Sequence, residues 1–131
     1  MTKYLEPAEI LIIHSRIIEK TGGAHGVRDV GLFISLAHRP KTAVFGKEAF
    51  PGIWKKAAVY FESLAQYHVF VDGNKRTALA VSSRFLYMNG YVLAVSNKEM
   101  EKFALEVANK KHDLNAISSW LKKHSKKVKR K

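Results

Sequence analysis

The chain has 131 residues, of which 47% are hydrophobic, and it contains no cysteine. This length suits one domain with a single core, and the apolar content is too high for a disordered protein. The lack of cysteine excludes disulfides, thiolate zinc sites and cysteine nucleophiles. There is no apolar run of about 18 residues and no signal-like N-terminus, so the sequence predicts a soluble, unexported, cytoplasmic protein without a membrane segment.

The formal net charge of +12 is concentrated at the C-terminus, where residues 122–131 (KKHSKKVKRK) carry seven Lys or Arg and no acid. The remaining residues hold 16 basic and 11 acidic side chains, a net charge of only +5. A basic run of this type is most often a solvated, frayed end. We therefore expect a domain over residues 1–121 and a basic tail over residues 122–131, with weak nucleic-acid binding as an alternative role of the tail.

Helical patterns dominate the first half of the chain. Residues 7–21 begin with a proline, carry isoleucines at helical spacing and stop at a Gly-Gly pair. A second helix follows Asp29 and has to end before Pro40, because the residue before a proline avoids the helical conformation. Residues 40–52 fit neither the helical nor the strand period and predict a long ordered loop, a kind of segment that tends to be functional.

In the second half, an apolar stripe over residues 53–70 predicts a helix of roughly four turns, with Glu62 and Gln66 on its solvent side. Residues 74–88 predict a further helix, which Asn89-Gly90 ends. Residues 91–95 suit a short extended segment, and cap signals at Ser96 and Asp113 start two more helices. The fold class predicted is a single all-α domain, a compact bundle of about six helices.

Residues 68–76, HVFVDGNKR, place six polar or glycine residues between two apolar-periodic stretches. Gly73 lets the backbone approach a ligand closely, and the first amides of the next helix, from Asn74 onward, attract phosphate. Lys75 and Arg76 add full positive charges at the same place. The sequence therefore predicts an anion site.

Asp72 fits such a site if Mg²⁺ lies between its carboxylate and the phosphates of a nucleotide. His68 is close enough in sequence to accept a proton from an attacking hydroxyl. Each residue also has an ordinary structural explanation: a histidine at a helix end, an Asp-Gly-Asn turn and a solvated Lys-Arg pair. Their coincidence within nine residues favours function. The other five histidines show no metal-ligand spacing, and none is predicted to be a site residue.

The segment HVFVDGNKRTA resembles the Fic/Doc motif, His-x-Phe-x-Asp/Glu-Gly-Asn-x-Arg, and most closely its death-on-curing (Doc) branch. Similarity extends over about residues 4–121, including GVRDVGLFISLAHRP and RTALAVSSRFLYMNGY. The resemblance implies that His68 is the general base and Phe70 a core anchor. It also implies that Asp72 binds Mg²⁺ and that Gly73, Asn74, Lys75 and Arg76 form the turn that binds the phosphates of ATP.

Two positions depart from the adenylyl-transferring Fic pattern: Lys75 replaces a glycine, and Leu79 replaces an arginine. Because both changes alter how a triphosphate lies, the resemblance to the Doc branch implies transfer of the γ-phosphate to a threonine of elongation factor Tu, which halts translation. It also implies an antitoxin protein that inhibits the site in trans. The alternatives are Fic-type AMP transfer to a protein hydroxyl and a non-enzymatic, basic nucleic-acid-binding module.

Within the predicted loop, the resemblance implies a flap that holds the target protein, here at Phe45, Gly46 and Lys47. The competing interpretation is that Phe45 and Phe50 are loop residues folded onto the core.

Overall fold

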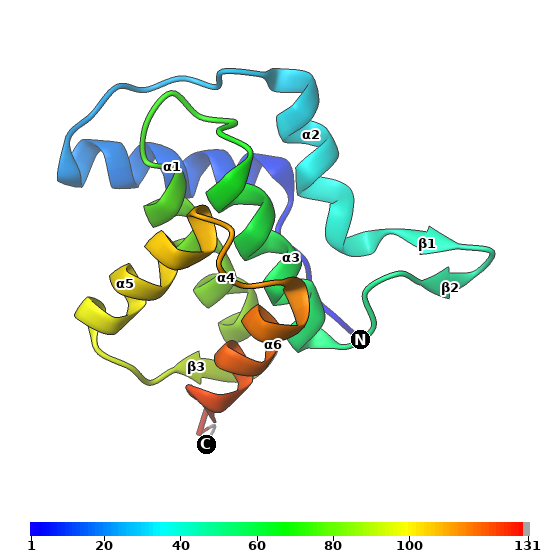
Figure 1. Cartoon of the computed structure of the whole chain (residues 1–131). Coiled ribbons are helices and arrows are strands. Elements are labelled where there is room, and N and C mark those ends of the chain that lie inside the picture. The colour runs from blue at the N-terminus through cyan, green and yellow to red at the C-terminus, as the bar shows by residue number, and fades with distance from the viewer. Residues whose placement is uncertain (130–131) are drawn as a thin grey trace.

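The computed structural model describes residues 1–129 and shows a mostly α-helical domain with two small antiparallel strand pairs (Figure 1). The helices are α1 (Pro7–Thr21), α2 (Val30–His38), α3 (Ile53–Gln66), α4 (Asn74–Met88), α5 (Asn97–Ala108) and α6 (Leu114–Lys123), and a 3-10 helix, η1 (Arg39–Lys41), follows α2. The strands are β1 (Ala43–Val44) paired with β2 (Lys47–Glu48), and β3 (Tyr91–Leu93) paired with β4 (Ser125–Lys127). The predicted fold class is confirmed. No helix within residues 1–129 combines the length and the hydrophobicity that a membrane span requires.

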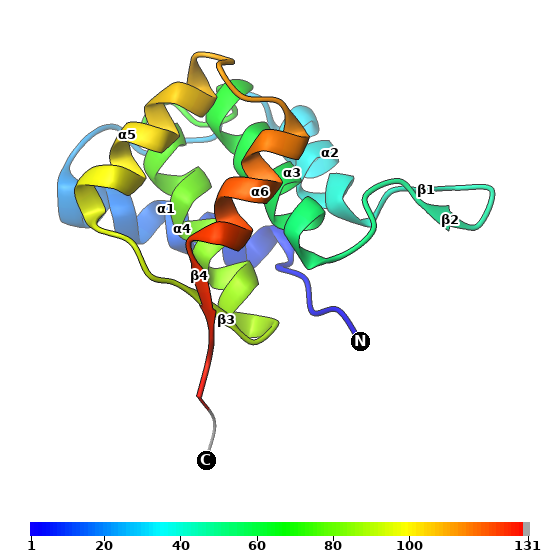
Figure 2. The same ribbon diagram turned by 60° about the horizontal axis from the view of Figure 1, so that its bottom comes forward.

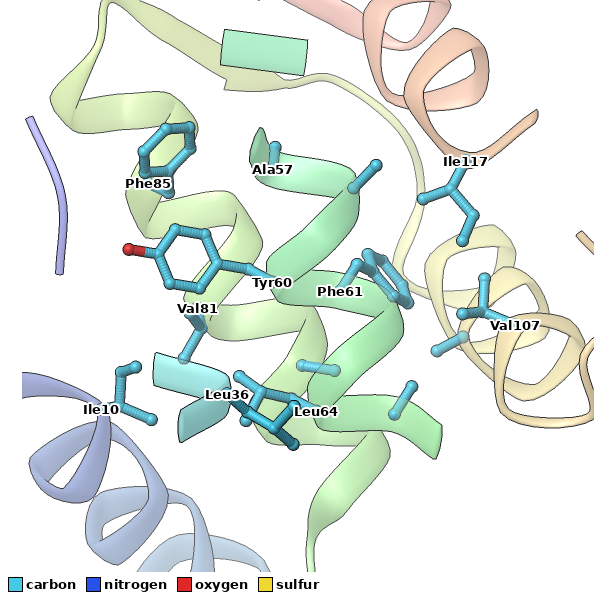
Figure 3. Packing of buried hydrophobic residues seen from close by; sticks show 14 of the residues in the cluster. Ile10, Leu36, Ala57, Tyr60, Phe61, Leu64, Val81, Phe85, Val107 and Ile117 are labelled. Atoms are coloured by element: carbon cyan, nitrogen blue, oxygen red, sulfur yellow. The ribbon is translucent and has the colours of Figure 1, made fainter. Parts of the chain in front are cut away.

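Helix α3 forms the centre of the core, and nine of its 14 residues are buried. Figure 3 shows Tyr60 facing Phe85 and Val81 of α4, while Phe61 points toward α5 and α6. Helix α4 is fixed along its length by this packing, because Ala78, Val81, Phe85 and Leu86 are all fully buried. The N-terminus of α4, where the predicted anion site lies, therefore has a rigid base.

Helix α4 has the bounds that its sequence predicts. It starts after Gly73 and is followed by Asn89 and Gly90, whose φ of 97° is a left-handed value that favours glycine. The predicted caps are confirmed too: the Ser96 side chain accepts a hydrogen bond from the Glu99 amide, and the Asp113 side chain accepts one from the Ala116 amide. Local signals of this kind are sufficient to define these four helix ends.

Helix α3 is shorter than predicted, because it ends at Gln66 and not at Phe70. Val69 and Phe70 continue the apolar pattern and are fully buried, but Phe70 forms an antiparallel bridge with Val27. A contact with a distant segment therefore takes these residues out of the helix. As a consequence, His68 lies in a loop and not at a helix end.

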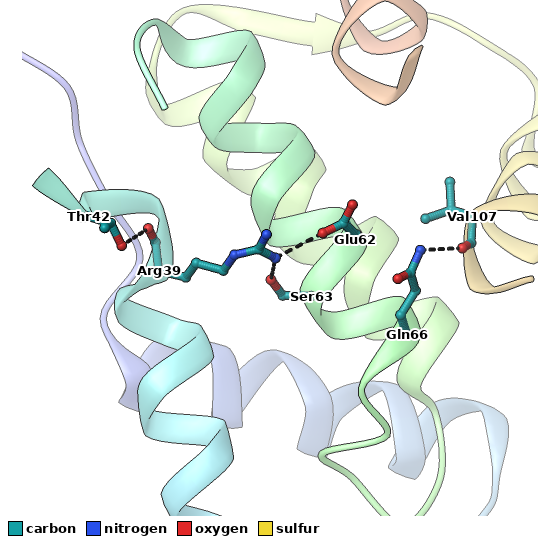
Figure 4. A network of polar contacts seen from close by, with 6 residues as sticks. All are labelled: Arg39, Thr42, Glu62, Ser63, Gln66 and Val107. Carbon is teal, nitrogen blue, oxygen red and sulfur yellow. Dashed lines mark hydrogen bonds and ion pairs between the residues drawn. The ribbon is translucent and has the colours of Figure 1, made fainter. Parts of the chain in front are cut away.

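The prediction that Glu62 and Gln66 face solvent is wrong. The Arg39 guanidinium contacts a carboxylate oxygen of Glu62 at 2.9 Å and also donates to the Ser63 hydroxyl, while the Gln66 amide donates to the carbonyl of Val107 at 2.9 Å (Figure 4). Both residues are half-buried. They connect α3 to the segment after α2 and to α5.

The segment predicted as a loop contains η1 and a two-stranded hairpin that projects from the helical body (Figures 1 and 2). Lys56 of α3 is 1% exposed, and its ammonium group donates to Glu48 of β2 at 3.0 Å and to the Phe50 carbonyl at 2.6 Å. The Arg39 guanidinium lies 5.4 Å from the centre of the Phe50 ring. These contacts fix the base of the hairpin to the domain.

The basic tail differs from the frayed end that its charge suggests. Residues 122–123 belong to α6, and residues 125–127 pair with β3 as strand β4 (Figure 2). Residues 130 and 131 lie outside the described residues. Both ends of the chain also bond to the turn after α4: the amide of Lys3 donates to the Asn89 side chain at 2.9 Å, and the amide of Val128 donates to the Gly90 carbonyl at 2.9 Å.

Tyr60 connects the N-terminal segment to α3. Its buried hydroxyl accepts a hydrogen bond from the Leu5 amide at 3.2 Å, and burial raises the pKa of Tyr60 above its ordinary value. We expect Tyr60→Phe to lower the free energy of unfolding by about 1–2 kcal/mol, because the buried Leu5 amide loses its partner. Urea unfolding followed by circular dichroism would measure this loss, and an unchanged midpoint would contradict the prediction.

Candidate functional site

The loop between α3 and α4 forms a short antiparallel backbone contact with the segment that follows α1. The amide of Arg28 donates to the Val69 carbonyl at 2.6 Å, and the amide of Val71 donates to the Gly26 carbonyl at 3.0 Å. Phe70 is the residue between these two bonds, and its side chain is fully buried. Val69 and Phe70 thus anchor the loop, whereas His68, Asp72, Lys75 and Arg76 are left at the surface.

His68 is one of these exposed residues. Its φ is 49°, a left-handed value that is uncommon for residues other than glycine and that occurs frequently at functional sites. Within residues 1–129 the imidazole has no hydrogen bond, so both ring nitrogens remain free for a substrate. This placement agrees with the predicted role of a general base.

Gly73 is the residue before α4 and has a left-handed conformation, with φ 78° and ψ 20°. A Cβ atom at this position would lie 3.0 Å from the end of the Ile18 side chain of α1, so it would be tightly packed as well as strained by the positive φ. No side chain caps α4. The amides of its first turn are therefore free to bind an anion, as the sequence predicts.

The Asn74 side chain binds the backbone of Phe70, a contact that the sequence does not predict. Its Oδ1 accepts from the Phe70 amide at 3.0 Å, and its Nδ2 donates to the Phe70 carbonyl at 3.0 Å. Both polar groups of the amide are therefore directed at the loop backbone. Within the predicted phosphate-binding turn, Asn74 can offer its backbone amide to an anion, while its side chain fixes the shape of the loop.

Lys75 and Arg76 are exposed in the first turn of α4. Together with Gly73 and Asn74 they line a hollow of about 250 Å³. The same two cations border a second, mostly apolar hollow of about 220 Å³ between α4 and α5, which Leu79 and Leu105 also line. The two hollows share Lys75 and Arg76, so they adjoin each other at the start of α4.

Asp72 has an exposed carboxylate, and its Oδ2 accepts a hydrogen bond from the Ala24 amide at 2.7 Å. Residues 1–129 contain no cluster of three or more His, Asp or Glu side chains that would hold a metal ion by themselves. Mg²⁺ commonly takes one carboxylate and completes its shell with phosphate oxygens and water. The donor set therefore fits a metal that arrives with a nucleotide, and it does not fit a permanent protein-only metal site.

His14 of α1 is a neighbour of the motif that sequence reasoning missed. It is 4% exposed, its ring stacks on Phe70 with centroids 3.8 Å apart, and its Nε2 lies 2.8 Å from the Asp72 carbonyl oxygen. The available signal was a titratable residue on the buried stripe of α1, between Ile10 and Ile18. Within the described residues, no other histidine side chain forms a hydrogen bond with the motif.

The predicted flap residues lie at the tip of the β1–β2 hairpin. Phe45 is 100% exposed, and both Phe45 (φ 51°) and Gly46 (φ 76°) have the left-handed backbone of a tight hairpin turn. Lys47 begins β2 and is exposed. Phe45 is thus not folded onto the core, whereas Phe50 is half-buried beneath Arg39.

Comparison with known proteins agrees with this geometry. The family model described as "Fic/DOC family" matches residues 4–86. A protein of Mycolicibacterium smegmatis named "Toxin Doc" is 41% identical over 123 residues, which cover 92% of each chain. A protein of Escherichia phage P1 named "Protein kinase doc" is 26% identical over 121 residues, covering 92% of this chain and 94% of its own. A match to the family model over more than half of the chain, around a loop that presents His68 beside the open end of α4, shows that the chain belongs to the Fic/DOC family.

Proposed function

We propose that the protein is a Doc-type toxin that transfers the γ-phosphate of ATP to a Thr or Ser hydroxyl of a translation factor. The observation that carries this proposal is the position of one exposed, left-handed histidine in the loop that leads into an uncapped, cationic helix N-terminus. The relative named "Toxin Doc" supports a toxin, and the relative named "Protein kinase doc" supports phosphate transfer to a protein.

In this reaction His68 accepts the proton of the acceptor hydroxyl through a ring nitrogen. The hydroxyl oxygen forms a bond to the γ-phosphorus while the bond from that phosphorus to the β,γ-bridging oxygen breaks, and ADP leaves. Lys75, Arg76 and the first amides of α4 bind the phosphate oxygens and stabilise their charge. Asp72 would hold Mg²⁺, which when bound neutralises part of the phosphate charge.

Two residues favour transfer from the γ-position over AMP transfer. Lys75 places a long cationic side chain where adenylyl-transferring relatives have a glycine, which changes the space left for the phosphates. Leu79 lines an apolar hollow on α4 and supplies no charge for a terminal phosphate. Fic-type AMP transfer remains the second candidate, because the base and the helix N-terminus would serve it equally.

The proposed acceptor is elongation factor Tu, a cytoplasmic protein, and its modification would arrest translation. The β1–β2 hairpin offers a surface for such a target, since Phe45 is fully exposed and the neighbouring Gly46 and Lys47 are exposed as well. The buried Lys56 holds the hairpin base in place. A target segment would meet a fixed structure and not a mobile loop.

We also propose that an antitoxin protein restrains the chain in trans. A groove of about 520 Å³ lies between α1 and α4. Ile12 and Ile13 form its apolar side, and Arg16 and Arg84 outnumber its one acid, Glu9. Arg84 follows Arg76 of the phosphate site by eight residues on the same helix, α4. An acidic amphipathic segment would match this surface.

The test is transfer of radioactive label to purified elongation factor Tu and to whole lysate, with ATP labelled in parallel at the γ- or the α-phosphate and with Mg²⁺ present. We expect label from the γ-phosphate only, and a loss of about 100-fold or more in His68→Ala, because a general base contributes that much. His38→Ala, which changes an exposed histidine at the end of α2, is the matched control and should keep full transfer.

Label from the α-phosphate would establish AMP transfer instead, and full activity of His68→Ala would exclude the base role. If the wild-type chain moves neither label, the nucleic-acid-binding alternative gains weight. It predicts salt-dependent binding that His68→Ala leaves intact and that Gln substitution of the lysines at 122, 123, 126, 127 and 129 removes. Substitution is preferable to deletion here, because residues 125–127 form β4.

A further inference from the structure

The carbonyl of Asp72 accepts a hydrogen bond from a side chain of α1, and this bond fixes the direction in which the carbonyl points. The Nε2 of His14 lies 2.8 Å from the carbonyl oxygen, and because a carbonyl only accepts, Nε2 carries the proton and donates. The face of the imidazole stacks on the ring of Phe70, at an interplanar angle of 8°. His14 is almost fully buried, so its ring has little freedom to move.

We infer that His14 is a positioning residue, which aims the phosphate-binding backbone of the site by holding the peptide group between Asp72 and Gly73. The inference deepens the proposed function and rests on it for its effect on nucleotide binding. Its effect on the loop is independent of any activity.

The peptide group between Asp72 and Gly73 is planar and trans, since residues 1–129 contain no cis peptide bond. The N–H of Gly73 therefore points opposite to the C=O of Asp72. Because His14 draws that carbonyl toward α1, the Gly73 N–H is directed away from α1. This direction adds one more donor to the free amides of the first turn of α4, beside Lys75 and Arg76.

The same peptide group also orients the carboxylate of Asp72. Its backbone is held by His14 of α1, and its Oδ2 by the amide of Ala24 in the segment that follows α1. Two points of attachment on neighbouring segments fix the side chain, which leaves Oδ1 for a metal that accompanies the nucleotide. Loss of the His14 bond would release the backbone attachment and free the peptide plane to rotate.

Two substitutions separate the hydrogen bond from the ring stack. His14→Phe keeps an aromatic ring on Phe70 but has no donor, whereas His14→Gln keeps an amide donor but has no ring. We expect His14→Phe to weaken binding of Mg²⁺ with a non-hydrolysable ATP analogue about tenfold in calorimetry, the effect of one hydrogen bond. His14→Gln should restore most of this affinity.

Hydrogen exchange of the hydrogen-bonded loop amides at residues 24, 70 and 71 is the readout that needs neither nucleotide nor turnover. His14→Phe should speed this exchange about tenfold, and His14→Gln should not. Phe33→Leu is the matched control, because Phe33 is also buried, with its ring 5.6 Å from that of Phe70, but makes no bond to Asp72.

Unchanged loop exchange in His14→Phe would overturn the inference, whatever the nucleotide affinity. Slower exchange of the loop amides in His14→Phe than in His14→Gln would also overturn the inference. The ring stack on Phe70, and not the hydrogen bond to Asp72, would then be the decisive contact. If the wild-type chain binds no nucleotide, the proposed function fails, and the exchange data still decide the role of His14.

Discussion

Phe70→Ala is expected to lower the free energy of unfolding by about 3–5 kcal/mol, the usual cost of removing a fully buried phenylalanine. The ring packs on His14 at 3.8 Å and on Phe33 at 5.6 Å between ring centroids. Its removal leaves a cavity directly beneath the loop that presents His68. Guanidinium unfolding measures the change, and a loss below about 1 kcal/mol would mean that the surrounding core collapses into the space.

Phe85→Ala is the matched control for this prediction. Phe85 is equally buried, but it lies deep in α4 against Tyr60 and Tyr4, away from the loop (Figure 3). Both substitutions should cost a similar free energy of unfolding. Only Phe70→Ala should also accelerate hydrogen exchange at residues 68–73, so equal exchange in both variants would deny Phe70 its role as the loop anchor.

Asn74→Ala is expected to lower the free energy of unfolding by about 2–4 kcal/mol. The substitution removes two hydrogen bonds at once and leaves the amide and the carbonyl of Phe70 without their partners. The turn that leads into α4 would loosen, and binding of Mg²⁺ with an ATP analogue should weaken with it. Thermal unfolding and calorimetry measure the two effects.

Asn74→Asp distinguishes the structural from the electrostatic role of this residue. Aspartate still accepts from the Phe70 amide and loses only the donor, so its loss of stability should be about half that of Asn74→Ala. It also adds a negative charge at the phosphate site, which should weaken nucleotide binding more than Asn74→Ala does. Equal affinities in the two variants would contradict this view of the site.

Much of the site is predictable because its signals are local. The bounds of α4, the left-handed Gly73 and the exposed Lys75 and Arg76 all follow from a short run of sequence next to a helix start. The caps at Ser96 and Asp113 are equally local. A residue pattern predicts such features well, because each depends on neighbours only a few positions away.

The features that the sequence does not predict depend on distant partners. Phe70 leaves the helical pattern because Val27 pairs with it, and the buried side of α1 gives no sign that His14 meets Asp72. The end of α3 and the half-buried Glu62, which contacts Arg39, have the same origin. None of these contacts lies within one helix, so the spacing of hydrophobic residues along the sequence does not predict them.

The basic tail is the clearest case of an interpretation changed by a remote contact. Its charge is typical of a solvated end, but the backbone of residues 125–127 finds open hydrogen-bonding groups in β3, more than 30 positions earlier. Strand pairing depends on the backbone and is compatible with lysine side chains that remain in water. Charge therefore described the surface of this segment and not its conformation.

The turn at Asn89 and Gly90 receives bonds from both Lys3 and Val128, so the first and last described segments lie beside the same turn. Domains whose terminal segments lie close together tolerate circular permutation when the new ends lie at an exposed tip. A linker from Val128 to Lys3, with the chain opened between Phe45 and Gly46, would leave the packing of α3 and α4 untouched. The order in which the helices follow one another along the polypeptide is thus separable from the arrangement that forms the site.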